Sequence, residues 1–428
     1  METIVIVGGG AGGLELATRL GDGCAKRGAA RVVLVDRWPS HFWKPLLHTV
    51  ASGARDPRVS QLDYSAQAAE HGFEFVRGEM VALDRQARTL TLAPVLGERG
   101  ETVLPQRAMP YDKLVLALGA VTNFFGVDGA ASHALTLDDV DQAEAFRVRF
   151  MGACIAEGSK APDERRGLDI VIVGGGATGV ELAAELRHSA RTLARYHVHA
   201  LDVERDVRIK IVERGPLLLP HLHARQSRRA ARQLRAMGVA VHTNTAVASV
   251  AGDHVRDGDG AIHRADLTLW AAGVEGPALC AGLGLAVNRM RQLAVGPTLQ
   301  VLGEQAIFAM GDCAGLVSPA TGAVPPRAQV AHQQALFLAQ ALALPANAAL
   351  PVFSFRDYGS LVSLGPVTAV GVLIGNGNRL QVGGATARLL YALMYTKHLL
   401  ALHGFVRMAA HTVADWLRAR LTPAVRLH

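Results

Sequence analysis

Two segments of the chain pass from a short run of β-branched apolar residues through a glycine turn into helically spaced apolar positions. They are TIVIVGGGAGGLELATRL, residues 3–20, and LDIVIVGGGATGVELAAEL, residues 168–186. The apolar runs suit strands buried in a parallel sheet, and the spacing after each turn suits a helix that packs on that sheet. We therefore predict an α/β fold with two Rossmann-like dinucleotide-binding domains.

The first glycine turn has the G-x-G-x-x-G spacing, at Gly8, Gly10 and Gly13. In this motif the first glycine permits the tight turn, the second lets the backbone approach a pyrophosphate, and the third allows close packing of helix on strand. A second strand, RVVLVD, ends at Asp36, where a carboxylate can accept hydrogen bonds from a ribose. Strand, glycines, helix, strand and acid all occur in the expected order.

The same spacing returns at Gly174, Gly176 and Gly179, and the strand RIKIVERG then carries Glu213 at the ribose position. An acid there repels a 2′-phosphate, so NADH is favoured over NADPH. Residues 188–206 form an insertion before this strand, with no role that the sequence reveals. The alternative is that both turns serve only strand-to-helix packing.

Two cradles predict two dinucleotides. A bound flavin with a diffusing nicotinamide is the simplest pair, because hydride transfer between stacked rings needs orientation and little side-chain chemistry.

A further helix is predicted after Pro325 and Pro326, over AQVAHQQALFLAQALAL, residues 328–344. Gln329 and Gln333 share one face of this helix. The pair is either part of an ordinary solvated helix start or a set of uncharged hydrogen-bonding groups for an apolar ligand.

Composition and charge narrow the class of protein only partly. The chain has 428 residues, enough for two or three domains, and half of them are hydrophobic, so disorder is not expected. A net charge of +7 permits nucleic acid, an anionic membrane surface or an anionic cofactor as partner. The four cysteines lie far apart and predict neither a zinc site nor a redox dithiol, and no other metal site is expected.

The C-terminal segment from Ala385 to His428 is basic and amphipathic, with six lysines and arginines against the single acid Asp415. Such helices lie in a membrane interface, pack on a core or form a dimer contact. No window has the eighteen or so uninterrupted apolar residues of a spanning helix.

With these motifs placed, the sequence resembles the type II NADH dehydrogenases, the non-proton-pumping NADH:quinone oxidoreductases of the two-dinucleotide-binding flavoproteins. The likeness covers nearly the whole chain. The stretches that carry it are GGGAGGLELA, FWKPLLHTVASG, YDKLVLALGAVTNFFG, GGGATGVELAAEL, WAAGV, IFAMGDCA, PPRAQVAHQQA and FSFRDYGSLVSLG. The resemblance implies bound FAD, NADH as substrate, and a membrane quinone as electron acceptor.

The resemblance also implies roles for individual residues. Gln329 and Gln333 would belong to the quinone site beside the flavin, and Glu181 would handle protons or orient groups near the nicotinamide, although a helix dipole alone favours an acid there. Asp312 would bind the ribityl or phosphate part of the flavin; its alternative is an N-cap. The remaining positions, near the flavin or nicotinamide, are Lys44, Pro45, Gly119 and Gly273.

The expected domains are 1–122 with 290–350 for FAD, 123–289 for NADH, and 351–428 for membrane anchoring or dimerisation. Residues 151–167, MGACIAEGSKAPDERRG, are expected to form a flexible loop that leads to the second cradle. The resemblance and the missing export signals place the protein peripherally on the cytoplasmic face of the inner membrane. An anionic membrane surface is then a partner, a homodimer is permitted, and nucleic acid is not expected.

Three other functions stay open. One is a flavin-bearing NADH sensor like the apoptosis-inducing factors, and another is an NADH-dependent reductase of a small iron protein. The third is a sulfide:quinone oxidoreductase, which would need redox cysteines around the flavin. Cys313 beside Asp312 suggests that chemistry, but no set of cysteines accompanies it, and we expect an inert buried thiol.

Overall fold

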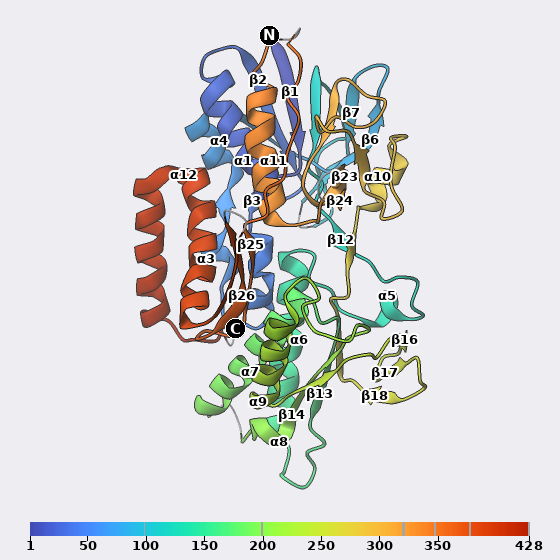
Figure 1. The fold of residues 1–428 in the computed structure, drawn as a ribbon, viewed down its shortest axis with the longest axis vertical. Coiled ribbons are helices and arrows are strands. Elements are labelled where there is room, and N and C mark those ends of the chain that lie inside the picture. The colour runs from blue at the N-terminus through green and yellow to red at the C-terminus, as the bar shows by residue number, and fades with distance from the viewer. Residues whose placement is uncertain (98, 198–199, 319–321, 346–347, 376–377, 427–428) are drawn as a thin grey trace. The chain divides into compact units, whose positions relative to one another are not determined.

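The structure, a computed structural model, describes residues 1–97, 99–197, 200–318, 322–345, 348–375 and 378–426 (Figure 1). The chain forms two compact units, each assembled from separate stretches. Unit 1 contains residues 1–44, 60–121 and 274–356, and unit 2 contains residues 45–59, 122–273 and 357–428.

Unit 1 is built on a five-stranded parallel sheet in the order β22-β11-β1-β2-β5. The central strand β1 (Glu2–Val7) is followed directly by helix α1 (Ala11–Leu20), as its pattern predicts. Ile4, Val5 and Ile6 are fully buried, as expected for the central strand of a parallel sheet. The other strands are β2 (Ala30–Asp36), β5 (Glu74–Arg77), β11 (Lys113–Leu116) and β22 (Ile307–Ala309).

Helix α11 (Ala328–Ala341) belongs to the same unit and packs on α1. A Cβ built on Gly12 would lie 3.1 Å from the Cβ of Ala331, so the two helices approach closely. A partly buried polar contact adds to this packing: His332 Nδ1 lies 2.7 Å from Glu15 Oε2. The glutamine-rich segment is therefore held against the helix of the first glycine turn.

Unit 2 repeats the design with the parallel order β15-β14-β13-β19. Strand β13 (Leu168–Val173) leads through the second glycine turn into α7 (Ala177–Arg195). Much of the insertion at 188–206 is the extension of α7, followed by the short helix α8 (Val203–Asp206). The remaining elements of this layer are β14 (Val207–Val212), α9 (Ala224–Ala236), β15 (Val239–His242) and β19 (Leu267–Trp270).

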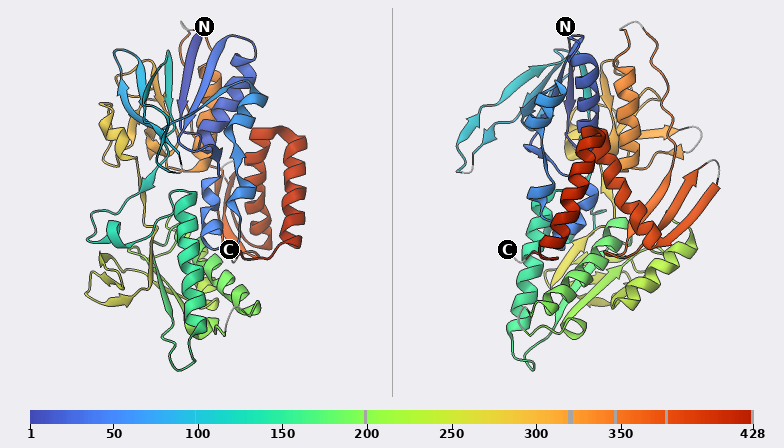
Figure 2. Two further views of the ribbon diagram at one scale, coloured as in Figure 1. Left: turned by 180° about the vertical axis from the view of Figure 1, so that it is seen from behind. Right: turned by 90° about the vertical axis from the view of Figure 1, so that its left-hand side faces the viewer.

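The C-terminal part of unit 2 is an antiparallel sheet followed by a long helix. The strands are β25 (Gly359–Ser363), β26 (Ala369–Gly375) and β27 (Asn378–Gly384), in sequential order. Helix α12 (Ala385–Leu421) is interrupted at Gly404, whose φ of 70° and ψ of 178° turn the chain, so that two helical segments lie side by side (Figures 1 and 2). In the described part of the chain, no helix is both long and apolar enough to cross a bilayer.

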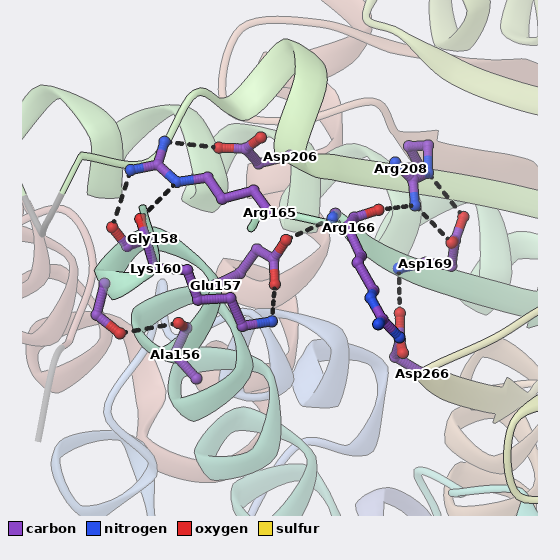
Figure 3. Close-up of polar contacts among 12 residues, drawn as sticks. Ala156, Glu157, Gly158, Lys160, Arg165, Arg166, Asp169, Asp206, Arg208 and Asp266 are labelled. Carbon is purple, nitrogen blue, oxygen red and sulfur yellow. Dashed lines mark hydrogen bonds and ion pairs between the residues drawn. The ribbon is translucent and has the colours of Figure 1, made fainter. Parts of the chain in front are cut away.

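One expectation about this unit is wrong. Residues 151–159 are not a flexible loop but the second half of helix α6 (Val140–Ser159), whose buried face includes Phe146, Phe150 and Cys154. The rest of the segment, residues 160–167, is held by charged side chains (Figure 3). Arg165 donates to Asp206 at 3.2 Å and to the Gly158 carbonyl at 3.2 Å. The path into the second glycine turn is thus fixed by helix packing and ion pairs.

Candidate functional site

The first glycine turn is open where a phosphate group is expected. It is tightly packed where the helix meets the strand. Gly8 has a φ of +106°, and a Cβ on Gly13 would lie only 1.8 Å from the Gly8 carbonyl oxygen, so neither position accepts a side chain. Gly10 is the N-cap of α1, where no side chain supplies a cap, and a Cβ there would meet no atom within 4 Å. The free N–H groups of the helix therefore face an open approach suited to an anion.

The second glycine turn has the same geometry. A Cβ on Gly179 would lie 2.1 Å from the Gly174 carbonyl oxygen, whereas one on Gly176 would meet nothing within 4 Å. Gly176 is the N-cap of α7 and again no side chain caps the helix. Each unit therefore carries an open, uncapped helix N-terminus of the kind that suits a pyrophosphate.

The acids predicted at the ribose positions also brace the turns. Asp36 accepts hydrogen bonds from Gly9 N at 2.6 Å and Trp38 N at 2.8 Å, and burial raises its pKa against the lowering effect of these donors. Glu213 accepts from Gly175 N and Gly215 N, both at 2.6 Å. Each carboxylate thus fixes the loop beside which a ribose would lie.

Asp312 and Lys44 lie in the same unit as the first cradle. Burial raises the pKa of Asp312, and the positive charge of Lys44 opposes this. Lys44 Nζ donates to the Ala120 carbonyl at 2.8 Å, next to Gly119, which has a φ of +71° and no atom within 4 Å of an added Cβ. Asp312 lies inside the 3₁₀ turn Gly311–Cys313, so the interpretation of Asp312 as a helix N-cap is wrong.

The three glutamines of the α11 start have different environments. Gln333 makes two hydrogen bonds to the backbone of Arg356, donating to its carbonyl at 2.8 Å and accepting from its N–H at 3.0 Å. Gln334, which was not predicted as a site residue, is buried and accepts from Gly311 N at 2.7 Å. Gln329 Oε1 is buried and has no hydrogen-bond partner among the described residues. Gln329 is therefore the member with an acceptor left for a ligand.

Gly273 and Pro45 belong to unit 2. A Cβ on Gly273 would lie 2.7 Å from the ring of Phe125, so a larger residue would displace that ring. Pro45 contributes its backbone carbonyl to the neighbouring buried His48, which raises the histidine pKa slightly against the larger effect of burial.

Glu181 is the centre of a buried polar cluster in unit 2. Its Oε1 accepts the Ser363 N–H at 2.9 Å, its Oε2 lies 3.6 Å from His48 Nδ1, and its side chain is hydrogen-bonded to Tyr391. These partners come from α2 (Leu47–Ala51), β25 and α12. No sequence signal predicted these partners, because they are distant along the chain.

Burial controls the charge of this cluster. It raises the pKa of Glu181 to about 8, although the Ser363 N–H and Tyr391 hydrogen bonds favour the carboxylate. It raises the pKa of Glu185, one turn further along α7, to about 7, with Arg388 opposing, and lowers that of His48 to about 4. Near neutral pH, Glu181 thus carries a proton and His48 is neutral, so their contact is not an ion pair. A carboxylic acid that titrates in this range can exchange protons during turnover.

The cysteines are all buried and free. Cys313 Sγ donates to the carbonyls of Leu116 at 3.4 Å and Met310 at 3.3 Å, and burial raises its pKa well above the usual value. Burial also raises the pKa of Cys154 to about 12 and of Cys280 to about 11. These thiols remain protonated and are poor nucleophiles, as expected for Cys313.

Comparison with known proteins identifies relatives over the full length. The family profile described as pyridine nucleotide-disulphide oxidoreductase matches residues 2–335. The type II NADH:quinone oxidoreductase of Haemophilus influenzae is 39% identical, with 100% of both chains covered. The type II NADH:quinone oxidoreductase Ndh of Mycobacterium tuberculosis is 28% identical over 96% of this chain and 87% of that protein.

Among solved structures, NDH2 from Plasmodium falciparum in complex with NADH is similar, with a TM-score of 0.83. The match covers 100% of this chain and 99% of that one at 20% sequence identity. At this identity the match establishes the fold, and it confirms the predicted α/β architecture with Rossmann-like domains.

Proposed function

The chain belongs to the pyridine nucleotide-disulphide oxidoreductase family and, within it, to the type II NADH:quinone oxidoreductases, and from this membership we infer its reaction and the roles of its residues. The protein is an FAD-dependent enzyme that oxidises NADH and reduces a quinone. The overall reaction is NADH + H⁺ + quinone → NAD⁺ + quinol. The assignment rests on the similarity to the type II NADH:quinone oxidoreductase of Haemophilus influenzae, which is 39% identical over the full length of both chains.

The first cradle fits the FAD pyrophosphate and the second fits that of NADH, because each has an open N-cap glycine at an uncapped helix N-terminus. When bound, FAD accepts a hydride from NADH and passes two electrons to the quinone. Asp36 and Glu213 would orient the two riboses, and Glu213 would disfavour a 2′-phosphate. Unit 1 is accordingly proposed to be the FAD-binding part, and unit 2 the NADH-binding part.

Gln329 is proposed to hydrogen-bond a quinone carbonyl or the flavin. Its carbonyl oxygen, Oε1, is buried without a partner among the described residues. An amide offers a donor and an acceptor without a charge that an apolar ligand would have to desolvate. Gln333 would act mainly by holding the backbone of Arg356 in place.

Glu181 is proposed to hold a proton for the reaction, which consumes one proton for each NADH oxidised. Support comes from its burial, its two hydrogen-bond partners Ser363 and Tyr391, and a pKa of about 8. Glu185 lies close enough to raise the Glu181 pKa further by its charge. The pair would therefore titrate as a coupled system.

The C-terminal region, 351–428, is proposed to attach the enzyme to an anionic membrane surface and to permit a homodimer. Helix α12 exposes large apolar side chains, and Phe405 and Val406, next to the Gly404 break, are 72% and 79% exposed. Six lysines and arginines lie between Ala385 and His428, in the same part of the chain. We accordingly propose that the enzyme binds peripherally to the cytoplasmic face of the inner membrane, where a quinone with a lipid tail is available.

The experiment that tests the assignment is a steady-state assay of purified FAD-loaded protein with NADH and a short-chain ubiquinone analogue. We expect one quinol for each NADH oxidised and a much lower rate with NADPH. Sulfide in place of NADH should give no quinol, because the buried thiols cannot act as nucleophiles. Quinol formation from sulfide, or NADH oxidation that reduces no quinone, would contradict the assignment.

A further inference from the structure

Residues 214–252 of unit 2 contain six arginines and not one aspartate or glutamate. Most of these arginines lie on helix α9 (Ala224–Ala236). Exposed members occur at intervals of three, four and three residues, which keeps them on one helix face. These exposed residues are Arg225, Arg228, Arg232 and Arg235.

No acid among the described residues neutralises the charge of this arginine face. None of the four exposed arginines takes part in an ion pair between described residues, and Glu204 is paired instead with Arg187 and Arg191. Elsewhere in unit 2, Arg165 and Arg208 are paired with Asp206 and Asp169 (Figure 3). A set of exposed cations that the fold leaves without acids is suited to an anionic partner.

The opposite face of α9 fixes the helix to the unit. Ala230 and Leu234 are fully buried, and Gln226 Nε2 donates to the Val382 carbonyl of β27 at 3.3 Å. Arg229 lies over β27, since a Cβ on Gly383 would be 2.6 Å from its guanidinium. Strand β27 continues directly into α12 at Ala385. The arginine face is therefore rigidly connected to the element that exposes apolar side chains.

Helices α9 and α12 also lie on the same side of unit 2. Both are on the left-hand side of this unit in Figure 1, and the right panel of Figure 2 views them from that side. A bilayer surface offers phosphate groups and an apolar interior within a few ångströms of each other. Nucleic acid would match the arginines alone and would leave Phe405 and Val406 exposed.

We propose that the arginine face of α9 docks on anionic phospholipid headgroups, next to the membrane contact of α12. This inference rests on the proposed membrane association and adds a second, purely electrostatic contact to it. The α12 contact would supply affinity for any bilayer, and the α9 contact would supply preference for anionic lipid. Each arginine near such a surface strengthens binding roughly fivefold.

The test uses the full-length, FAD-loaded protein and sedimentation with vesicles of phosphatidylcholine alone or mixed with phosphatidylglycerol. The variant Arg225→Gln/Arg228→Gln/Arg232→Gln removes three charges and keeps good helix formers on α9. We expect it to bind phosphatidylglycerol vesicles on the order of 100-fold more weakly than the parent and to bind neutral vesicles equally well.

A matched control removes three exposed arginines that form no ion pair between described residues, at Arg149, Arg256 and Arg289. The control variant should keep its preference for anionic vesicles. The proposal is overturned if the α9 variant binds anionic vesicles as tightly as the parent does, or if the control variant loses as much affinity for them as the α9 variant. It is also overturned if short RNA removes the parent protein from phosphatidylglycerol vesicles when the concentration of RNA phosphate is below that of lipid phosphate.

Assays with a water-soluble quinone distinguish a failure of this membrane-binding proposal from a failure of the proposed enzyme activity. The α9 variant and the control should oxidise NADH as fast as the parent, because none of the six arginines belongs to either cradle. A parent protein that fails to reduce quinone would refute the function, whatever the vesicles show.

Discussion

Replacing Glu181 by glutamine should change how the stability of the protein depends on pH. The folded-state pKa is about 8 against an ordinary value of 4.5, because the carboxyl is buried. The folded chain therefore binds this proton more tightly than the unfolded chain does. Its stabilising contribution is complete below pH 4.5 and is lost as the pH rises to about 8.

The size of the effect follows from these two values. At about 1.36 kcal/mol for each pH unit between them, the wild-type chain loses on the order of 5 kcal/mol over this range through Glu181. The Glu181→Gln variant has no such titration. Its amide oxygen can still accept from Ser363 N, and glutamine has nearly the shape of glutamate, so little packing is lost.

The assay is urea unfolding of the FAD-loaded proteins, followed by far-ultraviolet circular dichroism at several pH values from about 5 to about 9. The free energy of unfolding of the variant should rise relative to wild type by several kcal/mol across this range. Glu164→Gln, at an exposed carboxyl, is the control and should show no trend. If the free energies of unfolding of Glu181→Gln and wild type differ by an amount that stays constant within about 1 kcal/mol from about pH 5 to about pH 9, the high pKa of Glu181 is refuted.

Three further predictions concern the cradles, the quinone site and the thiol. Gly13→Ala places a Cβ 1.8 Å from the Gly8 carbonyl oxygen, which should lower the free energy of unfolding by about 3 kcal/mol and abolish FAD binding. Gly10→Ala should fold normally and should retain FAD more weakly. Thermal unfolding and flavin absorbance check this, and equal behaviour of the two variants would contradict it. Gln329→Leu should raise the KM for a soluble quinone about tenfold, at an unchanged KM for NADH, and an unchanged quinone KM would remove Gln329 from the site. Cys313→Ala should alter the steady-state rate by less than about twofold, and a loss of activity would revive a thiol mechanism.

The two cradles were predictable because all of their signals are local. Strand, glycines, helix and terminal acid follow one another within a few dozen residues, and the structure places Gly10 and Gly176 at open helix N-termini as the motif requires. The Glu181 cluster was not predictable in this way. Its partners Ser363 and Tyr391 lie far along the chain, on elements whose packing the sequence pattern does not specify.

The hydrogen-bond partners of the glutamines were likewise not predictable from the sequence pattern, although they lie closer along the chain. Their helix was predicted from proline and helix-forming residues. The pattern could not tell that Gln333 hydrogen-bonds the backbone of Arg356 and that Gln334 accepts from Gly311 N, while Gln329 Oε1 has no partner among the described residues. The loop predicted over 151–167 failed for a related reason. The segment was expected to be a flexible connection, whereas burial of Phe146, Phe150 and Cys154 carries helix α6 as far as Ser159.

Anaerobic stopped-flow absorbance of the purified yellow protein tests the transfer of electrons from NADH through the flavin to a quinone. The protein is mixed first with NADH and then with a short-chain ubiquinone analogue. We expect rapid bleaching of the flavin band by NADH and equally rapid recovery when the quinone is added. Bleaching that the quinone reverses slowly or not at all would contradict an NADH:quinone oxidoreductase and favour a sensor or a reductase of a small iron protein.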